Sequence, residues 1–425
     1  MRTLRFGSTG PAVQLLQLAL GRAGFGPLET DGVFGPATRG ALTRFQAVEH
    51  LNVDGIAGPA THRALLPWYT GYVPVRVRRG DSIWSLARLY GADSEAVRLA
   101  NPGLAPENLA VGSTLVVPLP FDVVPTRIAW CSALVGYCVQ GLSARYPFLL
   151  SGSVGKSALG KPLWSLRMGQ GENRVLYHAE HHANEWITTP LLLRFAEELA
   201  AAYAAGEELA GFRAGEILDY ATICLVPAVN PDGMDLVTGE LSTGEAYRAA
   251  RAIAARYPRY PFPSGWKANI RGVDLNLQYP AGWEQARANK YAQGISSPAP
   301  ADFVGEAPLT APEARAMAEL TERFDPALTL SYHSQGEVIY WSFRDYAPEN
   351  AQGIGALFAR LSGYALAEPP YASSFAGYKD WFLQEFRRPG YTVEVGRGVN
   401  PLPLEDFPEI YARNRELLTY AALVT

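Results

Sequence analysis

Residues 175–186 read VLYHAEHHANEW, an apolar run typical of a buried strand that leads directly into a cluster of histidines and acids. Three of the six histidines of the chain lie in this stretch, at His178, His181 and His182. A catalytic zinc site needs three protein ligands from His, Asp or Glu and one position open to water. His182 and Glu185, three residues apart, can point at a common ion, although surface pairs have the same spacing. The stretch therefore indicates two candidate zinc ligands.

A third ligand has to come from elsewhere, and His333 is the one histidine that follows the cluster. It ends residues 328–333, whose sequence LTLSYH predicts a strand. Open α/β sheets bind their ligands at the carboxyl ends of the strands. Because an isolated histidine is more often a core residue, spacing alone leaves His333 as a hypothesis.

Around these motifs, short β-like runs alternate with longer helical patterns. Residues 223–229 are typical of a further strand, and residues 189–205 and 311–324 are typical of helices. This alternation predicts a mixed, mainly parallel sheet between helices. Three prolines between positions 118 and 125 mark a linker. We therefore expect one α/β catalytic domain over residues 120–425.

The first part of the chain carries a short internal repeat. Residues 31–38 read DGVFGPAT, and residues 54–61 read DGIAGPAT. In each copy Asp-Gly favours a turn, and Gly-Pro puts proline at the first position of a helix, where its missing N–H does no harm. The repeat predicts a small helical domain over residues 1–70. It resembles the peptidoglycan-binding domain family, and a helical spacer without a ligand is the alternative.

Residues 73–119 form a second short unit. The apolar pattern predicts a strand, two helices and a closing strand, with Asp81 as a candidate N-cap of the first helix. With the phrases RGDSIW at residues 79–84 and ANP at residues 100–102, this βααβ unit resembles the LysM module. The resemblance implies binding of glycans that contain N-acetylglucosamine.

Composition narrows the class of partner. The 425 residues carry a formal net charge of −4 and have a pI near 6.0, which gives no electrostatic reason to expect nucleic acid or an anionic membrane. No stretch approaches the ~20 apolar residues of a membrane helix, so we expect no membrane insertion. The start, MRTLRFGSTG, lacks the apolar core of a secretory signal. We expect a protein that is either associated with the cell wall or released on cell lysis or during sporulation, with retention in the cytoplasm as the alternative.

A linked set of phrases extends from the histidine cluster to residue 394. In chain order these are HANEW, NPDG, GVDLN, YHS, KDW and TVE, which begin at residues 182, 230, 272, 332, 379 and 392. In order and spacing they resemble the zinc carboxypeptidase family, over roughly residues 120–425. The resemblance implies a mixed sheet between helices and one Zn²⁺ per chain, held by His182, Glu185 and His333.

The same resemblance implies roles for further side chains. It makes Glu394 the general base that deprotonates water and Asp274 the carboxylate that orients the His182 ring. An unpaired acid in the apolar strand around Glu394 would be costly, which independently favours a functional site there. The cation that stabilises the oxyanion is assigned to Arg271, with Lys267 as the alternative.

The candidate substrate-binding residues are Asn276, Tyr371, Lys379 and Arg397. Asn276 matches a family residue that grips the substrate's terminal carboxylate together with an arginine, but Leu277 stands in the arginine's place, which weakens an exopeptidase interpretation. Lys379 matches the floor of the primary specificity pocket and suits a carboxylate, and Arg397 is a second candidate cation. Tyr371 matches a mobile capping tyrosine if one residue is inserted, and Tyr378 is its competitor.

The motifs HHANEW, HSQGE and EVGRG begin at residues 181, 333 and 394 and follow the two modules that resemble wall-binding domains. Within the family, this combination most resembles the γ-D-glutamyl-L-diamino acid endopeptidase group. This resemblance implies cleavage between D-glutamate and the diamino acid, such as meso-diaminopimelate, of a peptidoglycan stem peptide. The glycan and the stem peptide are then the expected partners. A zinc carboxypeptidase that trims C-terminal residues is the first alternative, and a wall-binding protein without activity is the second. The absence of a GxSxG motif argues against a serine hydrolase.

Overall fold

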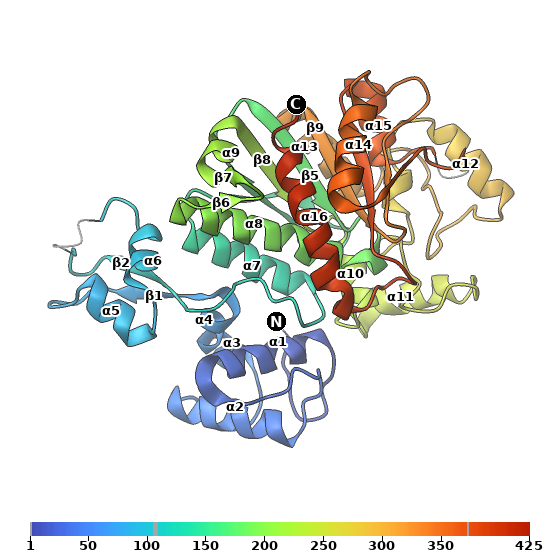
Figure 1. Cartoon of the computed structure of the whole chain (residues 1–425). Helices are drawn as coiled ribbons and strands as arrows, with labels where there is room; N and C mark the ends of the chain where they lie inside the picture. Colours follow the sequence, from blue (N-terminus) through green and yellow to red (C-terminus); the bar gives the residue numbers. More distant parts are fainter. Residues whose placement is uncertain (1, 105–108, 372–373) are drawn as a thin grey trace. The chain divides into compact units, whose positions relative to one another are not determined.

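The computed structural model describes residues 2–104, 109–371 and 374–425. The chain divides into two compact units, Met1–Leu150 and Ser151–Thr425 (Figure 1). Across the described residues, none of the helices is long and apolar enough to cross a membrane.

The first 70 residues fold into short helices around a core that includes Leu16, Phe34 and Phe45. Two of these helices begin at the proline of the repeated Gly-Pro motif, as predicted. The elements are α1 (Pro11–Leu20), the π-helical turn η1 (Gly21–Phe25), α2 (Pro36–Val48), α3 (Pro59–Ala64) and α4 (Leu66–Thr70).

A buried glutamine closes each copy of the repeat. Gln17 Nε2 donates to Asp31 Oδ1 at 2.7 Å, and Gln17 Oε1 accepts the N–H of Gly32 at 2.9 Å. The second copy makes the same two contacts, both at 2.9 Å, through Gln46, Asp54 and Gly55. Because the polar atoms of both amides find partners, the repeat buries them without leaving hydrogen bonds unmade. We call these two arrangements the glutamine clasps.

The next segment has the predicted order of strand, two helices and strand. Strands β1 (Tyr72–Arg76) and β2 (Thr114–Pro118) pair antiparallel, and α5 (Ile83–Tyr90) and α6 (Ser94–Leu99) pack on them around a small apolar core. The N-cap of α5 is Ser82, not Asp81 as predicted. The Ser82 side chain accepts the N–H of Ser85, whereas Asp81 accepts the N–H of Arg78.

Helix α7 (Ser132–Arg145) completes the first unit. Arg145 Nη2 donates to the backbone carbonyls of Gly71, Leu119 and Phe121, at 3.2, 2.8 and 3.0 Å. One guanidinium thus joins the helix to the residues on both sides of the β1–β2 unit. By its internal contacts, the linker beyond residue 120 groups with the first unit.

The second unit contains an eight-stranded mixed sheet, as predicted, in the order β11-β10-β12-β9-β5-β8-β4-β3. The central strands β12, β9, β5 and β8 run parallel, whereas β10 and β4 pair antiparallel with β12 and β8. The bounds are β3 (Leu150–Lys156), β4 (Pro162–Met168), β5 (Asn173–Ala179), β8 (Ala221–Val226), β9 (Leu328–Ser334), β10 (Val338–Tyr340), β11 (Ala365–Ala367) and β12 (Gly390–Val395).

Helices cover both faces of this sheet (Figure 1). The alternation of side chains along β5 shows the two layers, since Tyr177 bonds through its hydroxyl to the Leu418 carbonyl of α16, while Leu176 belongs to the core cluster that contains residues of α13 and α15. On the Tyr177 face lie α8 (Thr188–Ala205), α14 (Ala351–Ser362) and α16 (Phe407–Ala421). On the other face lie α13 (Pro312–Phe324) and α15 (Tyr378–Phe386).

Shorter elements surround the sheet. They are β6 (Glu208–Leu209), β7 (Phe212–Arg213), α9 (Ala214–Tyr220), α10 (Pro231–Val237), α11 (Gly244–Ala254), α12 (Trp283–Ala292) and the 3-10 turns η2 (Ala183–Glu185), η3 (Leu275–Leu277) and η5 (Leu404–Asp406). Since β5 and β9 are parallel neighbours, the segments that follow their carboxyl ends lie at the same edge of the sheet.

Candidate active site

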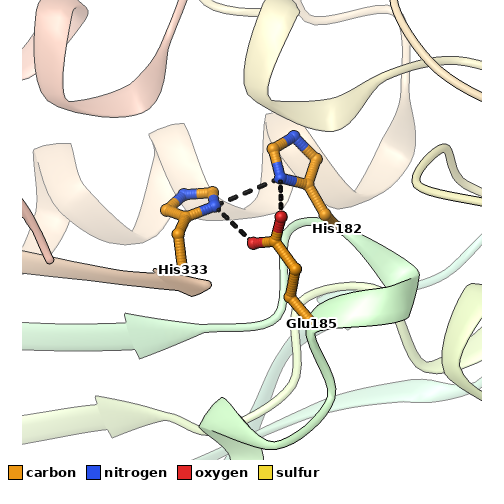
Figure 2. Close-up of side chains that lie close together, drawn as sticks. All are labelled: His182, Glu185 and His333. Carbon is orange, nitrogen blue, oxygen red and sulfur yellow. Dashed lines mark hydrogen bonds and ion pairs between the residues drawn. The ribbon is translucent and has the colours of Figure 1, made fainter. Parts of the chain in front are cut away.

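Three side chains converge at the carboxyl edge of the sheet (Figure 2). His182 follows β5, Glu185 lies in η2, and His333 lies near the end of β9. His182 Nδ1 is 3.1 Å from Glu185 Oε1, and His333 Nδ1 is 2.9 Å from Glu185 Oε2 and 3.2 Å from His182 Nδ1. All three residues are buried. The strand and the turn therefore bring together the three residues that the sequence singled out.

The donor atoms of this group fit a single zinc ion. Two imidazole nitrogens and a carboxylate are the ligands that catalytic zinc sites use, and tetrahedral coordination at ~2.0–2.2 Å sets ligand atoms about 3.3 Å apart. The measured separations of 2.9–3.2 Å are close to this value. Among the residues that the structure describes, this is the one group of three potential ligands found to converge.

Asp274 holds the other side of the His182 ring. His182 Nε2 lies 3.1 Å from Asp274 Oδ1, which leaves Nδ1 to face the metal position. Burial opposes ionisation of Asp274, but the charges of His182 and Lys267 outweigh it and hold the pKa of Asp274 well below its usual range. An ionised Asp274 accepts a hydrogen bond from the Nε2–H group of His182 and so fixes the tautomer in which Nδ1 can bind a metal.

Glu394 lies on β12, the strand next to β9, and pairs in register with His333. It lines the same cleft as His182, a cavity of about 330 Å³. Burial, and then the negative charge of Glu185, raise the pKa of Glu394 to about 8. A cation held between the two carboxylates would lower that pKa again. The Glu394 carboxylate can therefore hold a water molecule in the cleft and accept its proton.

The cation beside the metal group is Lys267. Its Nζ is 3.0 Å from Glu185 Oε1, and the side chain lines the cleft. Arg271, which the sequence analysis favoured, is exposed and does not belong to the residues that line the cleft. Asn269 Oδ1 accepts the N–H groups of Arg271 and Val273, which forms a tight turn around Arg271. The geometry thus favours Lys267 over Arg271.

Lys379 is buried and lines the cleft, but it is not a free charge. Its Nζ donates to Asp380 Oδ1 and to the Ser342 carbonyl, both at 2.6 Å. Asn276 also lines the cleft, and its Oδ1 accepts the N–H of Tyr378 at 3.0 Å. Both residues are therefore at the site, held by α15 and its N-terminal end.

Two other candidates, Arg397 and Tyr371, are not among the residues that line the cleft. Arg397 is 78% exposed, pairs with Glu337 at 2.7 Å, and lines a separate polar cavity of about 400 Å³. Tyr371 is 70% exposed and packs against Phe375. The structure does not place either side chain among the residues that line the cleft. Sequence position alone could not show that the turn after β12 directs Arg397 to another cavity.

Tyr378, the competitor of Tyr371, is a core residue. Its hydroxyl is 2.7 Å from Thr321 Oγ1, and the centroids of its ring and the His178 ring are 4.1 Å apart. His178 and His181 also lie outside the metal group, because their Nε2 atoms face Ser331 at 2.9 Å and Tyr279 at 2.8 Å.

A cluster that the sequence analysis did not single out lines the cleft as well. It consists of Tyr260, Lys290 and Asp302, from a loop, from α12 and from a second loop. No motif or spacing marks these three residues, since their proximity depends on how the loops fold.

Comparison with known proteins identifies the family of the chain. A family model described as zinc carboxypeptidase matches residues 137–416. The chain belongs to the zinc carboxypeptidase family. As a member, it is a zinc metallopeptidase that uses one zinc. Models for a peptidoglycan binding domain and for the LysM domain match residues 9–65 and 75–118, so the chain also carries modules for association with the cell wall.

Two curated relatives cover most of this zinc carboxypeptidase domain. Gamma-D-glutamyl-L-diamino acid endopeptidase 1 of Lysinibacillus sphaericus is 44% identical over 273 residues, which are 64% of this chain and 67% of the relative. The uncharacterized protein YqgT of Bacillus subtilis is 40% identical over 270 residues, which are 63% of this chain and 70% of the relative.

Solved structures show the fold. Thrombin-activatable fibrinolysis inhibitor superposes with a TM-score of 0.56 at 15% identity, over 83% of this chain and 97% of that chain. Carboxypeptidase A of Helicoverpa armigera superposes with a TM-score of 0.51 at 18% identity, over 84% and 96%.

Proposed function

We propose that the protein hydrolyses the bond between γ-linked D-glutamate and the diamino acid of peptidoglycan stem peptides. The observation that carries the proposal is a cleft in which Glu394 and Lys267 lie beside the His182–Glu185–His333 group, in a chain that also carries two wall-binding modules. The 44% identical relative is named for this bond.

The proposed roles follow from the positions of the side chains. When bound by His182, Glu185 and His333, zinc polarises the scissile carbonyl and acidifies a water molecule. Glu394 takes a proton from the water as its oxygen attacks the carbonyl carbon, and returns a proton to the amine that leaves when the C–N bond breaks. Lys267 Nζ stabilises the negative charge that develops on the carbonyl oxygen.

The replacement of the clamp arginine by Leu277 favours an endopeptidase. Leu277 lines the cleft next to Asn276, where it cannot pair with a carboxylate. A substrate whose diamino acid continues into further residues has no free carboxylate at that point, so the loss of the arginine does not weaken its binding.

A carboxypeptidase is the second candidate, and one observation favours it. Lys379 is a buried cation in the same cleft and can take the place of the missing arginine. The two functions differ in whether they require a free carboxylate at the end of the substrate.

The tripeptide L-Ala-γ-D-Glu-meso-diaminopimelate, with its terminal carboxyl either free or amidated, separates the two candidates. Mass spectrometry of the products should show L-Ala-D-Glu from both forms at comparable rates. Cleavage of the free form alone would establish the carboxypeptidase instead. If neither form of the tripeptide released L-Ala-D-Glu, the proposed cleavage of the γ-bond would be refuted.

A further inference from the structure

The γ-linkage leaves a free carboxylate near the scissile bond. In γ-linked D-glutamate the reacting carbonyl belongs to the side chain, so the α-carboxylate stays free. Four C–C bonds of ~1.52 Å separate the two carboxyl carbons, which places the free carboxylate about 5 Å from the reaction centre. In an α-linked peptide only a glutamate has a carboxylate at this separation, on its side chain, and a neutral residue has no charge there. A cation at this distance would favour a glutamyl residue over neutral ones, and in γ-linked glutamate the group that it binds is the free α-carboxylate.

Three lysines line the cleft, and two of them are already accounted for. Lys267 pairs with Glu185 of the metal group, and Lys379 donates to two acceptors, Asp380 Oδ1 and the Ser342 carbonyl. The third, Lys290 on α12, donates from Nζ to Asp302 Oδ1 at 2.6 Å. Since an ammonium group has three N–H donors, this bond leaves donors for a second acceptor.

Asp302, the partner of Lys290, is also engaged by a second polar side chain of the cleft. Tyr260 donates its hydroxyl to Asp302 Oδ2 at 2.9 Å and accepts a hydrogen bond from Arg259 at 3.0 Å. Both oxygens of Asp302 therefore have partners, so this carboxylate orients the Lys290 ammonium group and shares its charge with the Tyr260 hydroxyl. The remaining N–H donors of Lys290 can bind a second anion.

The cluster is also held close to the metal group. The backbone N–H of Asp302 donates to Asp274 Oδ2 at 3.1 Å, and Asp274 Oδ1 bonds to His182. The Lys290 side chain is only 12% exposed, so it is held in place before substrate arrives and its charge is weakly screened.

We propose that Lys290, oriented by Asp302 and assisted by the Tyr260 hydroxyl, binds the free α-carboxylate of γ-linked D-glutamate. The inference rests on the proposed function and names the side chain that recognises the glutamyl residue next to the scissile bond. Lys290 is a specificity residue, since it touches the substrate but not the reacting atoms.

The test compares the acid substrate L-Ala-γ-D-Glu-meso-diaminopimelate with the α-carboxamide analogue that contains D-isoglutamine. The wild-type enzyme should prefer the acid by about tenfold to a hundredfold in kcat/KM, as expected for a charge-assisted contact. Lys290→Met should reduce this preference to below threefold, and Lys290→Arg should restore part of it. The double variant Lys290→Met, Asp302→Asn removes both charges and should also lack the preference, which excludes repulsion by an unpaired Asp302.

Lys379→Met is the matched control, because it removes another lysine of the cleft and should lower both rates by the same factor. Equal losses on both substrates in Lys290→Met, or no preference in the wild type, would overturn the inference while the proposed function stands. If the wild type cleaves neither γ-bond, the proposed function fails, and the inference fails with it.

Discussion

The glutamine clasps and the metal group are both buried and polar, yet they are built in opposite ways. Gln17 and Gln46 are 2% and 1% exposed, and their amides find partners on both sides. In the metal group, His333 Nε2 is buried without a partner among the described residues, and burial, followed by the Glu185 charge, raises the pKa of neighbouring Glu394. Satisfied polar groups hold a fold together, whereas a concentration of buried charges with perturbed pKa values indicates chemistry.

The largest effect should come from Glu394→Gln. The amide keeps the shape of the side chain but cannot accept the proton of water, so kcat should fall by ~10²–10⁴ while zinc is retained. Steady-state kinetics on the tripeptide and metal analysis of the same sample measure both quantities. Turnover close to that of wild type in zinc-loaded protein would rule out Glu394 as the base.

Lys267→Met should be the next most damaging change. Loss of a group that stabilises the oxyanion costs ~10²–10³ in kcat. Arg271→Met, the matched surface variant, should change kcat less than about threefold, because Arg271 is exposed outside the cleft. The reverse order of effects would return the role to Arg271.

Lys379 provides a smaller and more selective test. If its ammonium group contacts the distal carboxylate of diaminopimelate, Lys379→Met should lower kcat/KM for the diaminopimelate substrate about tenfold more than for the lysine analogue. The ratio of kcat/KM between the two substrates is informative even if part of the protein unfolds when Asp380 loses its partner, because unfolded protein lowers both rates equally. An unchanged ratio would make the Lys379–Asp380 pair structural.

Mutations in the glutamine clasps should lower the stability of the first unit and leave turnover unchanged. Gln46→Leu leaves the Gly55 N–H and Asp54 without their buried partner, which should cost ~1–3 kcal/mol in the first unit. Gln17→Leu should cost a similar amount, because the two clasps make the same contacts. Hydrogen exchange of peptides from residues 1–70 measures the loss, and turnover of the soluble tripeptide should stay at the wild-type value. A fall in turnover would contradict the contrast drawn between the two regions.

Much of this arrangement could be read from the sequence, for identifiable reasons. The α/β fold, the helices after each Gly-Pro, and the grouping of His182, Glu185 and His333 depend on local patterns or on linked motifs. The position of Arg397 and the cluster around Lys290 depend instead on the paths of loops, for which neither periodicity nor motif gives a signal.

An anomalous-difference map from crystals grown with zinc tests the central claim most directly. We predict one strong peak at ~2.0–2.3 Å from His182 Nδ1, His333 Nδ1 and a Glu185 carboxylate oxygen, with His178 and His181 outside bonding distance. A peak bound by His181 in place of His182, or no peak at this edge of the sheet, would contradict the assignment of the metal site.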